Sequence, residues 1–79
     1  MSKYNTLREF VAAHHGEFTV DIAALDRVVP GGLAPSAATW DLWWNNNDPS
    51  HPQSKSWGDP GYDAVPDIPR GRVTFKPAG

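Results

Sequence analysis

Cysteine is absent from this chain of 79 residues. Its absence excludes disulfides and thiolate metal sites, and it fits a reducing compartment. No apolar run approaches the ~20 residues of a membrane-spanning helix, and residues 1–5 lack the apolar stretch of a signal peptide. We therefore expect a soluble, cytoplasmic protein that is not exported and has no membrane partner.

Basic charge is scarce as well. Seven Lys and Arg stand against nine Asp and Glu, which gives a net charge of −2. Proteins that bind a nucleic acid duplex non-specifically do so by neutralising phosphates, and they normally carry a basic excess. The charge balance therefore counts against that class, and counts less against binding of a small nucleotide or a single strand.

Catalytic and metal-binding motifs are missing too. The chain has no HExxH pattern, no Gly-x-Ser-x-Gly elbow and no phosphate-cradling glycine loop. His14 and His15 diverge by about 100° on a helix, so they cannot chelate one ion together, and His51 adds a single ligand. His51 paired with an aspartate, acting as a general base, is the catalytic alternative. Since so small a domain rarely builds a water-excluding pocket, we expect neither an enzyme nor a metal or other cofactor.

Aromatic side chains are plentiful: four Trp, two Tyr and three Phe. We expect one domain over residues 1–79, and a fold shorter than about 80 residues needs some extra support for its core. Large aromatic side chains, which bury roughly 150–250 Å² each, can supply it. Trp40, Trp43, Trp44 and Trp57 follow closely along the chain, so this segment is either the centre of the core or a binding surface.

Apolar spacing in the first half predicts two helices and a strand. Residues 5–15 have helical spacing, with Asn5 as the N-cap and Gly16 as the stop. Residues 18–20 read as a short strand. Thr19 is expected to cap a second helix that ends at residues 30–32. The expected buried stripe of that helix is Ile22, Leu25 and Val28 or Val29.

The second half predicts short elements and a hairpin. We expect a helical turn at 35–39, an extended aromatic segment at 40–44, a loop at 45–49, a short helix at 51–57, strands at 62–68 and 72–75, and a frayed tail at 76–79. Strand alternation would turn Val73 and Phe75 inward. In an extended segment Trp43 and Trp44 face opposite sides, so if Trp43 is buried, Trp44 is exposed.

The predicted fold class is therefore α+β. A small helical cluster, made of two helices and short helical turns, packs on a short antiparallel sheet with a C-terminal β-hairpin. This order of elements overlaps the winged-helix pattern, which serves here as an analogy only.

The chain also resembles a family of small bacterial and phage domains of unknown function. The resemblance covers residues 18 to 76 and rests on residues 33–37 (Leu-Ala-Pro-Ser-Ala), 43–46 (Trp-Trp-Asn-Asn), 51–53 (His-Pro-Gln), Trp57, Gly61-Tyr62 and 73–76 (Val-Thr-Phe-Lys). It implies an α+β domain with a C-terminal hairpin and brings no activity. Relatives are expected to have basic residues before the paired tryptophans, where this chain has residues 38–41 (Ala-Thr-Trp-Asp). Any phosphate contact made there would be lost in this chain.

Polar side chains near the tryptophans form the candidate ligand site: Trp40, Trp44, Asn46, His51, Gln53 and Ser36. Amide groups can read a base edge, and a Trp ring can stack on a base. The structural alternative is that Trp43 and Trp57 fill the core while Asn46, His51 and Gln53 brace the loop. Trp40 either joins an interface or packs on the neighbouring helical turn.

Cations on the hairpin form a second candidate surface, for phosphates or an acidic partner: Lys55, Arg70, Arg72 and Lys76. The alternative is a solvated strand edge that charge protects from aggregation. The first functional hypothesis is thus non-catalytic recognition of a nucleotide-type ligand or nucleic acid, in phage–host conflict. The alternative is a protein-interaction module, either an inhibitor of a host protein or a homo-oligomer, anchored by exposed Trp side chains.

Overall fold

The computed structural model describes residues 4–44, 53 and 55–78. Along the chain the elements are α1 (Asn5–Ala12), β1 (Phe18–Asp21), α2 (Ile22–Val28), the 3₁₀ turns η1 (Pro35–Ala38) and η2 (Asp41–Trp44), α3 (Lys55–Gly58), β2 (Tyr62–Asp67), the 3₁₀ turn η4 (Ile68–Arg70) and β3 (Arg72–Pro77). None of the helices in the described ranges is both long and apolar enough to cross a membrane.

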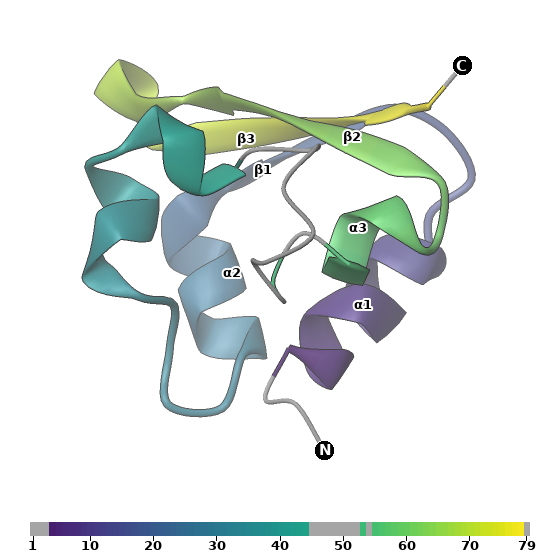
Figure 1. Cartoon of the computed structure of the whole chain (residues 1–79), viewed down its shortest axis with the longest axis horizontal. Coiled ribbons are helices and arrows are strands. Elements are labelled where there is room, and N and C mark those ends of the chain that lie inside the picture. The colour runs from purple at the N-terminus through teal and green to yellow at the C-terminus, as the bar shows by residue number, and fades with distance from the viewer. Residues whose placement is uncertain (1–3, 45–52, 54, 79) are drawn as a thin grey trace.

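The strands form one antiparallel sheet in the order β1-β3-β2. The helices cover one face of this sheet, and the other face is turned away from them (Figure 1). β3 therefore lies in the middle, with Thr74 opposite Thr19 on one side and Val65 on the other. The predicted α+β class, with a helical cluster on a short antiparallel sheet and a C-terminal hairpin, is confirmed.

Strand alternation decides which side chains enter the core. Val73 and Phe75 on β3 are fully buried, as predicted, and Ala64 on β2 lies beside them on the same face. The helices meet this face with a stripe that includes Leu7 and Leu25, both fully buried. Arg72 and Lys76, which alternate with the buried residues, are exposed.

Three tryptophans fill the space between the sheet and the short elements. The Trp44 ring centroid lies 4.7 Å from that of Trp43 and 5.3 Å from that of Trp57, and Trp57 lies 5.9 Å from Phe75. Offset and edge-on aromatic pairs at these distances add to the stabilisation that burial alone gives. This Trp cluster (Trp43, Trp44 and Trp57) is therefore the support that so short a chain needs.

Helix ends differ from the sequence prediction. α1 ends at Ala12 and not at residue 15, and Tyr4 is its N-cap. The following residues are held by Tyr62, whose hydroxyl donates to the His14 carbonyl and accepts from the Gly16 N–H, both at 3.0 Å. A contact with a distant strand thus ends the helix early, and local spacing does not reveal such a contact.

The start of the second helix also differs. Asp21, and not Thr19, is the N-cap of α2. Thr19 lies in β1, where its hydroxyl forms a 2.7 Å hydrogen bond with the hydroxyl of Thr74 on β3. Pairing with β3 extends the strand by one residue beyond the predicted range and delays the helix.

The extended conformation predicted for residues 40–44 is wrong. Asp41–Trp44 is the 3₁₀ turn η2, and the Trp43 N–H donates to the Trp40 carbonyl at 3.1 Å. The frayed tail predicted at 76–79 is also wrong for Lys76 and Pro77, which pair with β2 at the end of β3. The loop predicted at 45–49 lies outside the described residues, as does most of 51–54.

Candidate functional site

The polar and aromatic residues proposed from sequence do not form one surface. Trp44 is only 1% exposed, and its indole N–H donates to the Ala37 carbonyl at 2.9 Å. Gln53 is buried, with its amide donating to the Trp43 carbonyl at 3.4 Å, and Ser36 is half-buried. Asn46 and His51 lie outside the described residues.

The expected outward orientation of Trp44 is therefore wrong. In a strand, neighbouring side chains point to opposite faces, whereas in the η2 turn both Trp43 and Trp44 enter the core. Trp44 offers no ring face to a ligand in this structure. Gln53 braces the turn through its bond to Trp43, which is the structural alternative considered for it.

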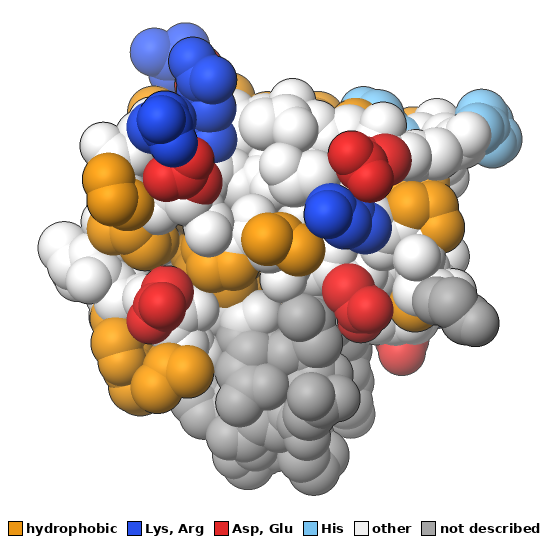
Figure 2. Space-filling model, turned by 90° about the horizontal axis from the view of Figure 1, so that it is seen from above, with side chains coloured by type: hydrophobic (Ala, Val, Ile, Leu, Met, Phe, Trp, Pro, Cys, Tyr) orange, Lys and Arg blue, Asp and Glu red, His pale blue; other side chains and the backbone are white. Residues whose placement is uncertain are grey.

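The proposed cations lie beside carboxylates. The Arg70 guanidinium is 3.0 Å from the Asp67 carboxylate, and that of Arg72 is 3.7 Å from Asp21. Lys76 stands opposite Asp63 in the β2–β3 register. Figure 2, which looks onto the outer sheet face, shows Lys and Arg side chains interspersed with Asp and Glu. For Lys55 the structure gives the place in α3 but no description of the side chain.

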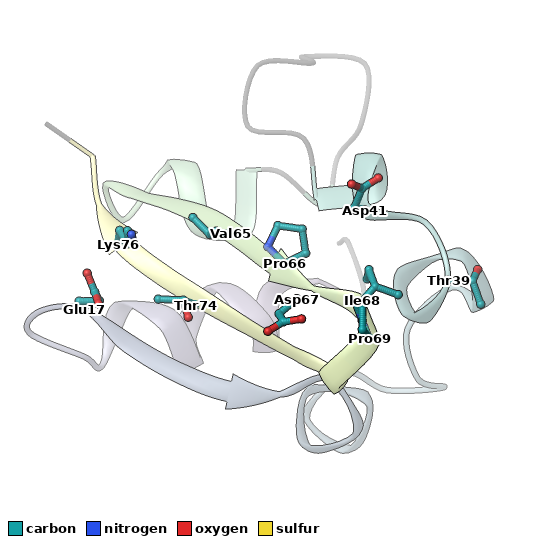
Figure 3. Close-up of a pocket in the computed structure, with 10 residues that line it drawn as sticks. All are labelled: Glu17, Thr39, Asp41, Val65, Pro66, Asp67, Ile68, Pro69, Thr74 and Lys76. Atoms are coloured by element: carbon teal, nitrogen blue, oxygen red, sulfur yellow. The ribbon is translucent and has the colours of Figure 1, made fainter.

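The outer sheet face holds a shallow depression of about 680 Å³. Glu17 and Lys76 lie at one end and Asp41 and Thr39 at the other, with β2 between them (Figure 3). Three carboxylates, those of Glu17, Asp41 and Asp67, line it against the single ammonium group of Lys76. Such a lining repels phosphate, so the depression does not suit a nucleotide or a nucleic acid backbone.

The most distinctive exposed feature is an apolar protrusion at residues 40–42. Trp40 is 48% exposed and Leu42 is 58% exposed, with Asp41 exposed between them. We call this segment the 40–42 protrusion. In Figure 2 hydrophobic side chains gather on the left, the side on which the 3₁₀ turns η1 and η2 lie in Figure 1.

Its backbone is fixed at both ends. The Trp40 N–H donates to the Ser36 carbonyl at 2.8 Å, and the Trp40 carbonyl accepts from the Trp43 N–H. Directly after Leu42, the buried Trp43 and Trp44 anchor the chain in the core. Trp40 and Leu42 are therefore held outward by the same turn that buries their neighbours.

An apolar groove of about 510 Å³ lies between α2 and η1. We call it the α2–η1 groove; it is lined by Ile22, Ala23, Asp26, Arg27, Leu33, Ala34, Pro35, Ala37, Ala38 and Gly71. Small alanine side chains leave the space open. One carboxylate is already engaged, because Asp26 Oδ1 accepts a 2.7 Å hydrogen bond from the Leu33 N–H.

Sequence reasoning identified Trp40 but missed Leu42 and the groove. Leu42 stands within an aromatic run of which only Trp40 and Trp44 were candidate binding residues. The signal for the groove was the run of small residues at 34–38, which follows a helix and two glycines. Among the described residues, no three His, Asp or Glu side chains are grouped so that they could hold a metal ion.

Comparisons with known proteins agree with the sequence analysis only in pointing to a domain family of unknown function. Neither the curated proteins nor the solved structures include a significant match. A family described as "Domain of unknown function (DUF7662)" does match, over residues 4–78, which includes all of the described strands and helices. Because the match covers nearly the whole chain, this protein belongs to that family.

Proposed function

We propose that this domain binds another protein through the 40–42 protrusion. The observation that carries the proposal is the exposure of Trp40 and Leu42 on a turn whose next two residues, Trp43 and Trp44, are buried. The protein-interaction module considered from the sequence, as an inhibitor of a host protein or as a homo-oligomer, is thus the hypothesis that the geometry supports best.

Burial of the protrusion would stabilise a complex. Covering a large apolar side chain contributes on the order of 1.5–3 kcal/mol, and Trp is among the residues that dominate interface energies. The hydrogen bonds of Trp40 to Ser36 and Trp43 fix the backbone before any partner arrives. Since less conformational entropy is then lost on association, a larger share of the burial energy appears as affinity.

Charge near the protrusion favours a protein over a nucleic acid. Asp41 lies within the protrusion and also lines the depression that holds Glu17 and Asp67. Phosphates would be repelled here, while a protein surface can offer a neutral or basic side chain. The partner is therefore expected to combine an apolar contact area with a cation.

Recognition of a nucleotide has less support. Of its proposed side chains, Trp44 and Gln53 are buried, and Asn46 and His51 lie outside the described residues. Trp40 is the proposed ring that remains exposed, and a single ring could stack on one base. Titration of Trp fluorescence with nucleotides tests this alternative: quenching that is lost in Trp40→Phe would favour it over a protein partner.

Photocrosslinking tests the proposed function directly. A benzoylphenylalanine placed at position 40 is irradiated in cells that make the protein, and the same group at position 15, where His15 is exposed, is the matched control. We expect a discrete crosslinked band from position 40 alone, and its loss when Leu42→Ser is added. Equal patterns from both positions, or no band from position 40, would contradict the proposal.

A further inference from the structure

We infer that the partner is a second copy of this chain, with the 40–42 protrusion of each copy seated in the α2–η1 groove of the other. This inference rests on the proposed function and names the partner for it. Two complementary features of one molecule carry the inference: the fixed, apolar 40–42 protrusion and the open, apolar α2–η1 groove. Each has beside it a charged side chain without an ion-pair partner among the described residues.

The 40–42 protrusion and the α2–η1 groove match in polarity and in size. At about 510 Å³ the groove falls within the range of pockets that bury a small-molecule or side-chain ligand, roughly 300–1,000 Å³. Ala23 on one wall and Ala34 and Ala38 on the other leave room for a large side chain. Trp40 and Leu42 are two of the large hydrophobic side chains that the described surface leaves exposed, and neither lines its own groove.

The charges fit as well. Arg27 lines the groove, is exposed, and forms no ion pair with another described residue. Asp41, at the centre of the protrusion, is exposed and has no ion-pair partner in the part of the chain that the structure describes. Seating the protrusion in the groove of another copy would bring Asp41 of one chain toward Arg27 of the other, so each charge would gain an opposite neighbour.

The position of the two features permits a reciprocal contact. Ala38 lines the groove and Trp40 follows it by two residues, so both features lie beside η1. Neighbouring features that complement each other suit a two-fold interface, in which each contact occurs twice. A net charge of only −2 per chain opposes such pairing weakly. Dimer formation would also bury apolar surface that a chain of this length cannot bury alone.

Sedimentation velocity over a concentration series, from about 1 μM to 1 mM, is the test. We expect a monomer–dimer equilibrium for the unaltered chain. Trp40→Ala should weaken it, and Ala23→Leu should weaken it by filling the groove. Ala23 is exposed on a helix and Leu is a good helix former, so this variant should keep its fold. Thermal melts identify any variant that has lost its structure.

A charge exchange gives the sharpest comparison. Asp41→Arg and Arg27→Asp each place like charges together across the proposed interface, so each should raise the dissociation constant on the order of tenfold or more. The double variant Asp41→Arg/Arg27→Asp restores opposite charges and should recover most of the affinity. Recovery in the double variant supports the inference, since a loss through unfolding of either variant would not be reversed by the other.

Two results would overturn the inference: a monomer at every concentration, or a dimer that all of these substitutions leave unchanged. Failure of the proposed function can be distinguished from failure of this inference. A crosslink from position 40 to a different protein, with a chain that sediments as a monomer, would leave the proposed function standing and remove the second copy as the partner. A crosslink between two copies, lost in Ala23→Leu, would support both.

Discussion

Trp40 and Trp44 are the same residue type four positions apart, and their surroundings give them different roles. Trp44 is 1% exposed, contacts Trp43 and Trp57, and donates its indole N–H to Ala37. Trp40 has about half of its surface in solvent. The difference arises from a single turn of 3₁₀ backbone, which directs one ring inward and leaves the other outside.

Alanine substitution should separate the two roles. Trp44→Ala removes a buried aromatic ring and leaves the Ala37 carbonyl without its donor, so we expect a loss of about 3–5 kcal/mol in the free energy of unfolding. Trp40→Ala should cost less than about 1 kcal/mol, because its ring is half-exposed. Urea denaturation of both variants gives the comparison. Similar losses for the two would contradict the structure.

Tyr4 should make the stability of the fold sensitive to alkali. Burial raises the pKa of the Tyr4 hydroxyl above its ordinary value of 10.0. As the pH rises, the unfolded chain loses this proton first, so the contribution of Tyr4 is complete below pH 10 and is lost as the pH rises through the folded pKa. We expect the Tm of Tyr4→Phe to fall less steeply than that of the unaltered chain between about pH 9 and 11. An equal decrease of Tm with pH in the two proteins would exclude this contribution of Tyr4.

At the scale of elements, the hairpin was the part of the fold that sequence predicted best. Alternation of Val73, Thr74 and Phe75 is local information, and the register of β3 with both neighbours preserves it. The short helical turn at 35–38 and the glycine stop after α2 also follow from local rules, because proline favours the start of a helix and glycine its end.

Residues 40–44 show why the candidate site could not be predicted in the same way. Their aromatic composition favours a strand when considered alone. In the structure the turn is stabilised by distant partners, such as Trp57 in α3 and Phe75 in β3, which surround Trp44. Two adjacent tryptophans can then both be buried, and the apolar residues before them are left outside. The amino-acid composition of residues 40–44 does not reveal these distant contacts.

The loop between α2 and η1 should depend on one glycine more than on its neighbour. Gly31 and Gly32 both have positive φ, at 78° and 82°. A Cβ at Gly32 would lie 2.8 Å from Asp26 Oδ1, whereas one at Gly31 would have nothing within 4 Å. Gly31→Ala should therefore cost about 1–2 kcal/mol through backbone strain alone. Gly32→Ala should cost more, since it also displaces the carboxylate that binds the Leu33 N–H.

Denaturant unfolding of the two glycine variants side by side provides the measurement, and Gly31→Ala is the matched control. Equal losses would mean that the contact between Asp26 and the loop contributes nothing to stability. Because Asp26 and Leu33 both line the α2–η1 groove, the same comparison in sedimentation reports on the shape of the groove.

For the molecule as a whole, the Trp cluster joins elements from both layers. Trp43 lies 6.2 Å from Tyr4 beside α1, and Trp57 lies 5.9 Å from Phe75 in the sheet. Loss of either layer would expose the cluster. In a Trp40→Phe background, where fluorescence reports on the cluster alone, we expect urea transitions followed by Trp emission and by far-UV circular dichroism to coincide. Two separate midpoints would show that the layers unfold independently.

The central position of β3 has a consequence for synthesis. β1 and β2 are not neighbours in the sheet, and both pair only with the strand that leaves the ribosome last of the three. Thr19 pairs with Thr74, which is 55 positions further along the chain. Closing so long a loop costs conformational entropy and slows formation of the contact. Until β3 has left the ribosome, β1 and β2 lack the strand with which they pair, and Trp44 and Trp57 lack their contact with Phe75. Chaperones and proteases can therefore act on these segments before the sheet forms.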